Sequence, residues 1–186
     1  MSRDKPSRNK TIDIFKIENL GAYAVKLRIF LVMLCLAAYI PLMPVNYFTI
    51  TDAGGTLLAS PVTNGASFIT SYIHSVQLSP VIDDYRFVNG LIWGWEERTQ
   101  SHNAGLPSTA PEHGKLIMNP PWMITRGGRA SHTAIFHRVG SDKLGRNTWR
   151  LPPFAEISAF EIYPSARVSL SVSIRRLIDS PVVGFK

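Results

Sequence analysis

Two carboxylates of this chain are spaced so that they could lie side by side and share a proton or a cation. Asn89-Gly90 separates two alternating segments, and this dipeptide is typical of the two-residue turn of a β-hairpin. In an unbroken hairpin Asp83 faces Glu96, and like charges placed directly opposite each other repel. The two negative charges must be compensated by Arg98, which lies diagonally opposite on the neighbouring strand, by a shared proton or by a bound cation. Such a pair could also carry out acid–base chemistry.

Histidine is the second residue type that could do chemistry here. His74 adjoins Ser75, but neighbouring strand side chains point to opposite faces, so they form no catalytic dyad. His74 is better explained as a hydrogen-bonded structural residue. His132 and His137 are five residues apart, which puts them on opposite faces of a strand, and no HExxH motif accompanies them.

The motifs of common enzyme classes are also missing from the sequence. It contains no P-loop, G-x-G-x-x-G or G-x-S-x-G motif. We therefore expect a protein without enzymatic activity, metal site or cofactor. Acid–base catalysis by Asp83, Glu96 and His74 is the least favoured hypothesis.

The segments that would position these residues alternate in the manner of β-strands. Short runs separated by turn residues about every ten positions predict an antiparallel β-sandwich or barrel. Trp93 and Trp95 share one strand face, which we expect to belong to the core. At most one helical turn is expected, within 151–160. The predicted strands are 47–51, 56–60, 67–75, 81–88, 91–99 and 167–175, with short strands at 115–118 and 122–125.

An uncharged apolar segment precedes the β-rich region. Ile29–Met43 contains no charged side chain, and extended back to Ala22 it reaches the roughly twenty residues that cross a bilayer. Pro41 predicts that the regular helix ends near Ile40. A cleaved signal peptide and a buried core helix are the alternatives. We predict a basic cytoplasmic tail (1–21), a transmembrane anchor (22–45) and a β-rich periplasmic domain (46–186).

The distribution of charge indicates the orientation of this helix. The chain has a net charge of +7, and seven Lys and Arg against three Asp and Glu precede the apolar segment. The positive-inside rule places that end in the cytoplasm. The excess charge therefore reflects membrane topology, and we expect no nucleic-acid partner. Cys35 is the only cysteine, so the β-rich domain has no disulfide framework.

The order of several short motifs is similar to that of a known family. His74-Ser75-Val76, Ser79-Pro80-Val81, Asp83 and Tyr85 follow the pattern H-S-V-x-x-[ST]-P-V-x-E-x-Y. Asn103-Ala104-Gly105-Leu106-Pro107 then corresponds to G-A-G-[LM]-P. Over roughly Phe68 to Ile174 the chain resembles the DUF1850 family. It departs from the pattern at Asp83, where the family has Glu, and at Asn103, where the family has Gly.

The resemblance implies both a location and a partner. Members of that family are small, singly anchored bacterial proteins, and their genes often lie beside those of TAXI-type TRAP transporters. This implies a non-catalytic accessory subunit in the cytoplasmic (inner) membrane, whose periplasmic domain contacts the transporter permease or its solute-binding protein. The alternative is a self-standing periplasmic ligand- or envelope-binding module, with a pocket formed by the aromatic strand and the loop 101–129. The residues implied to form or brace the contact surface are His74, Ser75, Val76, Pro80, Val81, Asp83, Tyr85, Asn103, Ala104, Gly105, Leu106 and Pro107.

Overall fold

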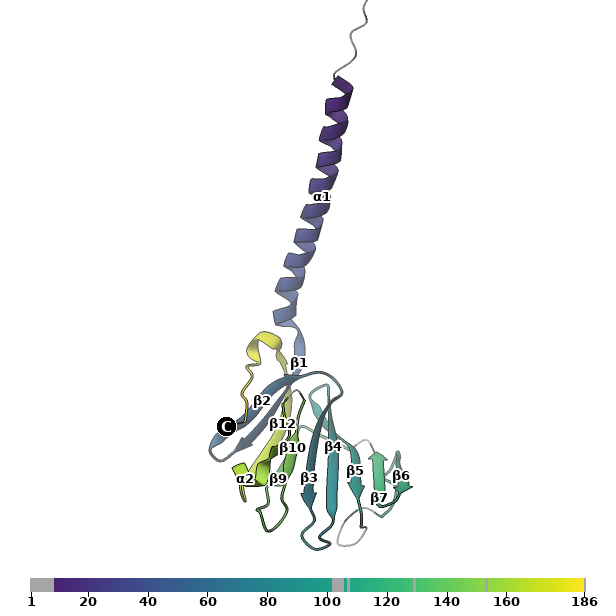
Figure 1. The fold of residues 1–186 in the computed structure, drawn as a ribbon, viewed down its shortest axis with the longest axis vertical. Coiled ribbons are helices and arrows are strands. Elements are labelled where there is room, and N and C mark those ends of the chain that lie inside the picture. Colours follow the sequence, from purple (N-terminus) through teal and green to yellow (C-terminus); the bar gives the residue numbers. More distant parts are fainter. Residues whose placement is uncertain (1–8, 102–105, 107, 129, 153, 186) are drawn as a thin grey trace, which may run out of the picture. The chain divides into compact units, whose positions relative to one another are not determined.

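The chain divides into two compact units, residues 1–43 and 44–186. The computed structural model describes residues 9–101, 106, 108–128, 130–152 and 154–185, with side chains described from Tyr23 onward. The first unit is a helix and the second is built from β-strands (Figure 1).

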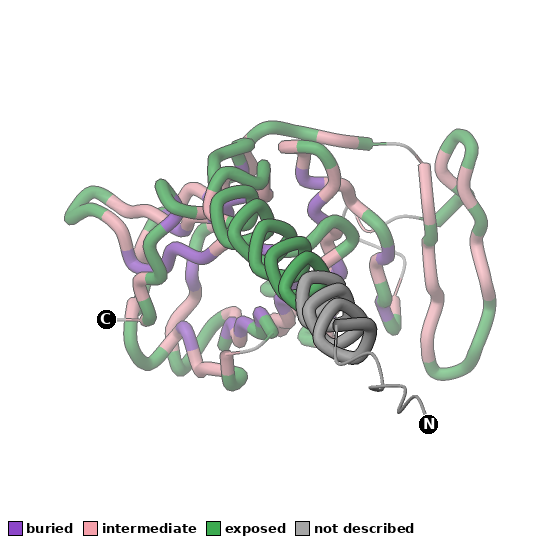
Figure 2. The backbone as a smooth tube through the Cα atoms, turned by 90° about the horizontal axis from the view of Figure 1, so that it is seen from above, coloured by how far each residue is buried: buried purple, intermediate pink, exposed green. Residues whose placement is uncertain are grey.

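The first unit contains helix α1 (Asn9–Tyr39), followed by a 3₁₀ turn (Ile40–Leu42). Pro41 lies in that turn, which confirms the predicted end of the regular helix. The segment Tyr23–Leu42 has a mean hydropathy of 2.0, and none of it is buried. Figure 2 shows this exposure around the described part of the helix. The helix is long and apolar enough to cross a membrane, a property that an N-terminal signal sequence shares.

The second unit consists of two sheets in which all neighbouring strands are antiparallel, which confirms the predicted all-β class. The smaller sheet has the order β2 (Gly55–Val62), β1 (Pro44–Asp52), β12 (Arg167–Arg176), β9 (Ala134–Arg138). The larger has the order β11 (Ile157–Ser158), β10 (Thr148–Arg150), β3 (Ala66–Ile73), β4 (Pro80–Val88), β5 (Leu91–Thr99), β7 (Trp122–Gly127), β6 (Gly114–Asn119), and β8 (Ser131–His132) also pairs with β5. One helical turn, α2 (Ala159–Ile162), and a 3₁₀ turn (Leu177–Asp179) complete the unit.

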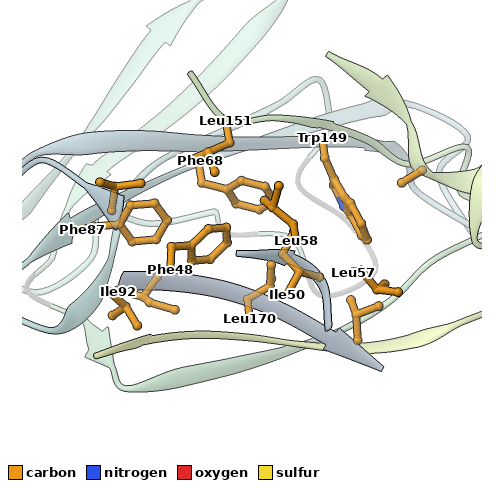
Figure 3. Close-up of a cluster of buried hydrophobic side chains, with 14 of the residues drawn as sticks. Phe48, Ile50, Leu57, Leu58, Phe68, Phe87, Ile92, Trp149, Leu151 and Leu170 are labelled. Atoms are coloured by element: carbon orange, nitrogen blue, oxygen red, sulfur yellow. The ribbon is translucent and has the colours of Figure 1, made fainter. Parts of the chain in front are cut away.

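The two sheets pack face to face through an aromatic core, which makes the domain a sandwich. Phe48 of β1 lies 4.5 Å from Phe87 of β4 and 5.2 Å from Phe68 of β3, measured between ring centroids. Figure 3 shows these rings between the layers, with Trp149 of β10 at the other end of the cluster. Burying one such side chain contributes roughly 1.5–3 kcal/mol, so this contact is a main source of stability.

Most predicted strands are confirmed, with small differences at their ends. Asn89 and Gly90 have φ of 51° and 74°, as a hairpin turn with two left-handed residues requires. Val168, Leu170 and Val172 are buried in β12, but Ile174 on the same face is 52% exposed. The strands predicted at 115–118 and 122–125 correspond to β6 and β7.

The β4–β5 hairpin departs from the predicted register at one point. Tyr85 lies opposite Gly94, as predicted, but the register shifts between Asp84 and Tyr85. Asp83 therefore faces Glu97, and the predicted pairing of Asp83 with Glu96 is wrong. The cause is a β-bulge, which inserts one extra residue into one strand of a pair. The extra residue here is Trp95.

Candidate functional site

Asp83 and Glu97 lie on the inner face of the larger sheet, next to the hydrophobic core. Alternation along β4 points Val81, Asp83 and Tyr85 to the same side as the buried Phe87. Across the β4–β5 ladder, Asp83 faces Glu97. The two carboxylates thus stand on one face of adjacent strands, where directly opposed Cβ atoms lie about 4.5–5.5 Å apart.

Other polar side chains share this inner face. Thr70 of β3 faces Asp83, Tyr72 faces Val81, and Thr99 of β5 faces Val81 from the other side. The smaller sheet contributes His137 of β9, whose Nε2 is 3.4 Å from the Tyr85 hydroxyl. Its ring meets the Tyr85 ring edge-on at 5.9 Å. We call this set the inner polar cluster; it comprises Thr70, Tyr72, Asp83, Tyr85, Glu97, Thr99 and His137.

Burial disfavours the charged forms of every titratable member of the inner polar cluster. Burial and the Glu97 charge raise the pKa of Asp83 to about 7, and burial raises the pKa of Glu97. Burial and the nearby Asp83 raise the pKa of both Tyr72 and Tyr85. Burial lowers the pKa of His137. Because the His137 imidazole is then neutral, it supplies no positive charge to the carboxylates.

The compensated carboxylates of the hairpin lie on the opposite, outer face. Glu96 accepts hydrogen bonds from Arg98 and, at 2.6 Å, from Arg126. Burial alone would raise the pKa of Glu96, but these two arginines hold it below its ordinary value. The sequence hypothesis that Arg98 compensates a carboxylate is therefore correct for Glu96, whereas Asp83 is not its partner.

Asp84 is compensated on the same outer face. It pairs with Arg86 at 2.7 Å and accepts a hydrogen bond of 2.6 Å from the Ser67 hydroxyl. Among the residues that the structure describes, Asp83 and Glu97 have neither an ion pair nor a hydrogen bond. The bulge thus places Asp84 and Glu96, which arginines compensate, on the outer face. It leaves Asp83 and Glu97, which have no such partner, on the inner face.

A cavity of about 390 Å³ opens at the uncompensated pair. Its lining includes Asp83, Tyr85 and Glu97, the compensated Asp84 and Glu96, Thr125 of β7 and Thr109 from the loop before β6. This volume lies in the range of small-molecule sites, roughly 300–1,000 Å³. The inner polar cluster is therefore the candidate site of the domain.

His74 serves a different, local purpose. Strand β3 ends at Ile73, so His74 lies in the following turn and not on the strand. Its Nδ1 accepts hydrogen bonds from the backbone N–H groups of Val76 (3.3 Å) and Gln77 (3.2 Å). Its own backbone bonds to Ser79 and Leu78. These contacts confirm the structural interpretation of His74.

The fold places the other residues predicted for a contact surface in different parts of the domain. Ser75 and Val76 lie in the turn after β3, whereas Pro80 begins β4 and Val81 is fully buried. Only Asp83 and Tyr85 of the predicted set belong to the inner polar cluster. Leu106 is half-buried, and Asn103, Ala104, Gly105 and Pro107 lie outside the described residues.

The two tryptophans of β5 are not part of the core. Trp93 faces Arg86, and both Trp93 and Trp95 line an outer-face groove of about 420 Å³. The side chain of Trp95 is 45% exposed. The prediction that this face belongs to the core is wrong, because the inner positions of β5 are occupied by Ile92, Gly94 and Glu97.

The sequence of the site region matches one family. Residues 68–151 match the family described as "Domain of unknown function (DUF1850)". The match places the region 68–151 in the DUF1850 family. The matched region begins within β3 and ends one residue after β10, so it includes every residue of the inner polar cluster. No curated protein and no solved structure matches the chain.

Five members of the inner polar cluster were not identified as site residues from the sequence, namely Thr70, Tyr72, Glu97, Thr99 and His137. Glu97 was missed because its place depends on the bulge, and the only signal is the consecutive pair Glu96-Glu97. His137 was compared with His132, but these residues lie on strands of different sheets. Thr99 carried no signal at all.

Within the described part of the chain, no three His, Cys, Asp or Glu side chains are grouped so that they could hold a metal ion.

Proposed function

We propose that this DUF1850 protein is a non-catalytic accessory subunit of a TAXI-type TRAP solute transporter, anchored in the cytoplasmic membrane of a bacterium. The observation that carries the proposal is the helical segment Tyr23–Leu42, apolar and unburied along its length, directly before a β-sandwich. In this role α1 is a retained anchor, and the sandwich works at the periplasmic surface.

The charge distribution supports the orientation in this proposal. Lys26 and Arg28 lie at the start of the apolar segment, and the remaining basic excess precedes them. Long basic side chains can extend to the headgroup region from the first turns of a membrane helix. By the positive-inside rule the N-terminus is then cytoplasmic.

The choice of partner rests on the family resemblance and on the limits of a single helix. One transmembrane helix cannot enclose a transport path, so the chain needs a larger membrane partner if it serves transport. A helix whose apolar side chains are all unburied offers surface to lipid and to neighbouring helices alike. The accessory role gives this helix a second task besides anchoring, namely packing against the permease.

The decisive experiment is co-purification from native membranes. The tagged full chain, extracted in mild detergent, should bring down a multi-span permease or a solute-binding protein. A variant in which residues 23–42 are replaced by an unrelated single-pass helix serves as the matched control. It should still localise to the membrane but recover less of the permease. Repeated preparations that lack any transporter subunit would rule out the accessory role.

The second candidate function is a self-standing periplasmic ligand-binding module. The cavity of about 390 Å³ at the uncompensated carboxylates favours it. A thermal-shift series of small organic acids on the purified chain separates the two roles. The accessory role predicts no response in the absence of the partner, whereas a solute-binding module raises its melting temperature with its solute.

A further inference from the structure

Within the described part of the chain, the inner polar cluster contains two carboxyl groups and no basic side chain that pairs with them. Asp83 and Glu97 face each other across β4 and β5, and the described residues around them supply no ion pair. The groups that face the pair are Tyr72 and Tyr85 from the same sheet and, through Tyr85, His137 from the other sheet. All three are neutral near pH 7, because burial shifts each away from its charged form.

Two buried hydroxyl groups beside the pair also have no partner. Thr70 and Thr99 are 0% and 1% exposed, and neither Oγ1 atom has a hydrogen-bond partner. Thr70 stands directly opposite Asp83, and Thr99 lies two positions beyond Glu97 on the same face of β5. Leaving a buried hydroxyl without a hydrogen-bond partner destabilises the folded state. The strand register places both side chains on the inner face, beside the carboxylates, and their lack of a partner is an observation independent of the carboxylates.

From these observations we infer that the inner polar cluster binds a primary ammonium group, with Asp83 and Glu97 as its counter-charges and a threonine hydroxyl as a further acceptor. An ammonium has three N–H donors and no acceptor, which fits a site whose two carboxylates and threonine hydroxyls can all accept hydrogen bonds. Tyr85 adds an aromatic ring, which attracts cations placed over its face. The adjoining cavity holds the alkyl part of the ligand.

Other cations fit the site less well. A divalent metal ion needs more carboxylate or imidazole ligands than the cluster supplies, since within the described part of the chain no three such side chains are grouped for one. A quaternary ammonium has no N–H group and would leave the hydroxyls of Thr70 and Thr99 unpartnered. The proposal therefore commits to a primary amine.

The test is calorimetric titration of the full-length protein in detergent with n-butylamine at pH 8. We expect saturable binding, with tetramethylammonium, butyrate and Ca²⁺ at least about tenfold weaker. Tetramethylammonium has no N–H donor, butyrate is an anion, and Ca²⁺ finds too few ligands in the cluster. Asp83→Asn and Glu97→Gln should each weaken binding by about tenfold or more. Thr70→Val should weaken it less, and Glu161→Gln on α2, an exposed carboxylate outside the cavity, should leave it unchanged.

Three results would each overturn the inference. The first is the absence of saturable n-butylamine binding, the second is unchanged binding in both carboxylate variants, and the third is Ca²⁺ or tetramethylammonium binding as tightly as the primary amine. If the variants do not fold, the unaltered protein still decides the question. Its affinity must fall by about tenfold or more between pH 8 and pH 5.5, because Asp83, whose pKa is raised to about 7, becomes protonated and loses its charge while the amine stays charged.

A primary ammonium can come from a free amine or from a lysine of a partner protein. Co-purification of the Asp83→Asn variant from native membranes distinguishes these sources. Loss of the partner, with the variant folded and in the membrane, assigns a lysine side chain, whereas retention of the partner assigns a free amine. A chain with no partner at all contradicts the accessory role but leaves the calorimetric result standing.

Discussion

Asp83 of β4 faces Glu97 of β5 on the inner side of the sandwich, one residue out of step with the hairpin turn that joins their strands. The displacement arises at Trp95, the extra residue of the bulge. It places Glu96 against two arginines on the outer face and leaves Glu97 beside Asp83 in the interior. The electrostatic character of the site therefore depends on a single inserted residue.

Removing the charge of Asp83 should stabilise the protein at alkaline pH. Its pKa is raised to about 7 in the folded state, so between about pH 4 and pH 7 the folded state binds more protons than the unfolded state. Stability then falls as pH rises through this window, and the full cost is present above it. We expect Asp83→Asn to raise the free energy of unfolding at pH 8 by on the order of 1–3 kcal/mol.

Urea unfolding at pH 4 and pH 8 measures this effect. The gain should be small at pH 4, where Asp83 is protonated in the folded state and already partly protonated in the unfolded state. The unaltered protein should lose free energy of unfolding between pH 4 and pH 8. If Asp83→Asn loses the same amount, Asp83 is not the source of that loss.

Glu96 should show the opposite pH dependence. Hydrogen bonds from Arg98 and Arg126 outweigh burial and lower its pKa, so its stabilisation is present above its unfolded-state pKa and is lost as pH falls below it. Both arginines are nearly half exposed, and solvent screening reduces the value of the pairs. Glu96→Ala should cost about 1–2 kcal/mol at pH 7. Thermal unfolding at pH 7 and pH 3 checks this, and an equal cost at both values would contradict it.

Deleting Trp95 should be tolerated, unlike most deletions within a strand. Without this residue β5 pairs with β4 in an unbroken register, in which Gly94 still faces Tyr85 and Glu97 still faces Asp83. We expect a loss of about 1–2 kcal/mol. Deleting Ser71 is the matched control, because β3 pairs with β4 without a break and the deletion moves half of the strand to the wrong face. Circular dichroism during heating should show a cooperative unfolding transition for the Trp95 deletion and no such transition for the Ser71 deletion.

The hydrogen-bond acceptor of His74 should matter more than its imidazole ring. His74→Asn retains an acceptor near the Nδ1 position and should keep the turn, whereas His74→Leu should cost about 1 kcal/mol by leaving the Val76 and Gln77 N–H groups unpaired. Chemical denaturation of the two variants provides the comparison. Equal losses in both would mean that ring packing, and not hydrogen bonding, supports the turn.

The proposed topology can be tested with single cysteines. Cys35 is the only cysteine of the chain, so Cys35→Ser provides a background without thiols. Phe136→Cys introduces a thiol at a residue that is 83% exposed on β9, and Lys10→Cys introduces one before the apolar segment. A membrane-impermeant maleimide applied to spheroplasts should label position 136 and not position 10. Labelling of position 10 and not of position 136 would show that the orientation is opposite to the proposed one.

Local sequence patterns determined most of the fold. Period-two alternation identified the long strands, and Asn89-Gly90 identified the central hairpin, because both are short-range properties of the backbone. Pro41 marked the end of α1, and the uncharged segment before it marked the helix. The strand pattern predicted either a sandwich or a barrel. Only tertiary contacts, such as that of Phe48 with Phe87, decided between these two folds.

The site itself was decided by tertiary structure. By itself the sequence indicated that Asp83 faces a carboxylate across a hairpin, but it did not show which one, because a bulge has no reliable local signature. His137 joined the site because strands distant in sequence pack face to face. Burial between two sheets then raised the pKa of Asp83, a property that depends on the surrounding atoms and not on the order of residues along the chain.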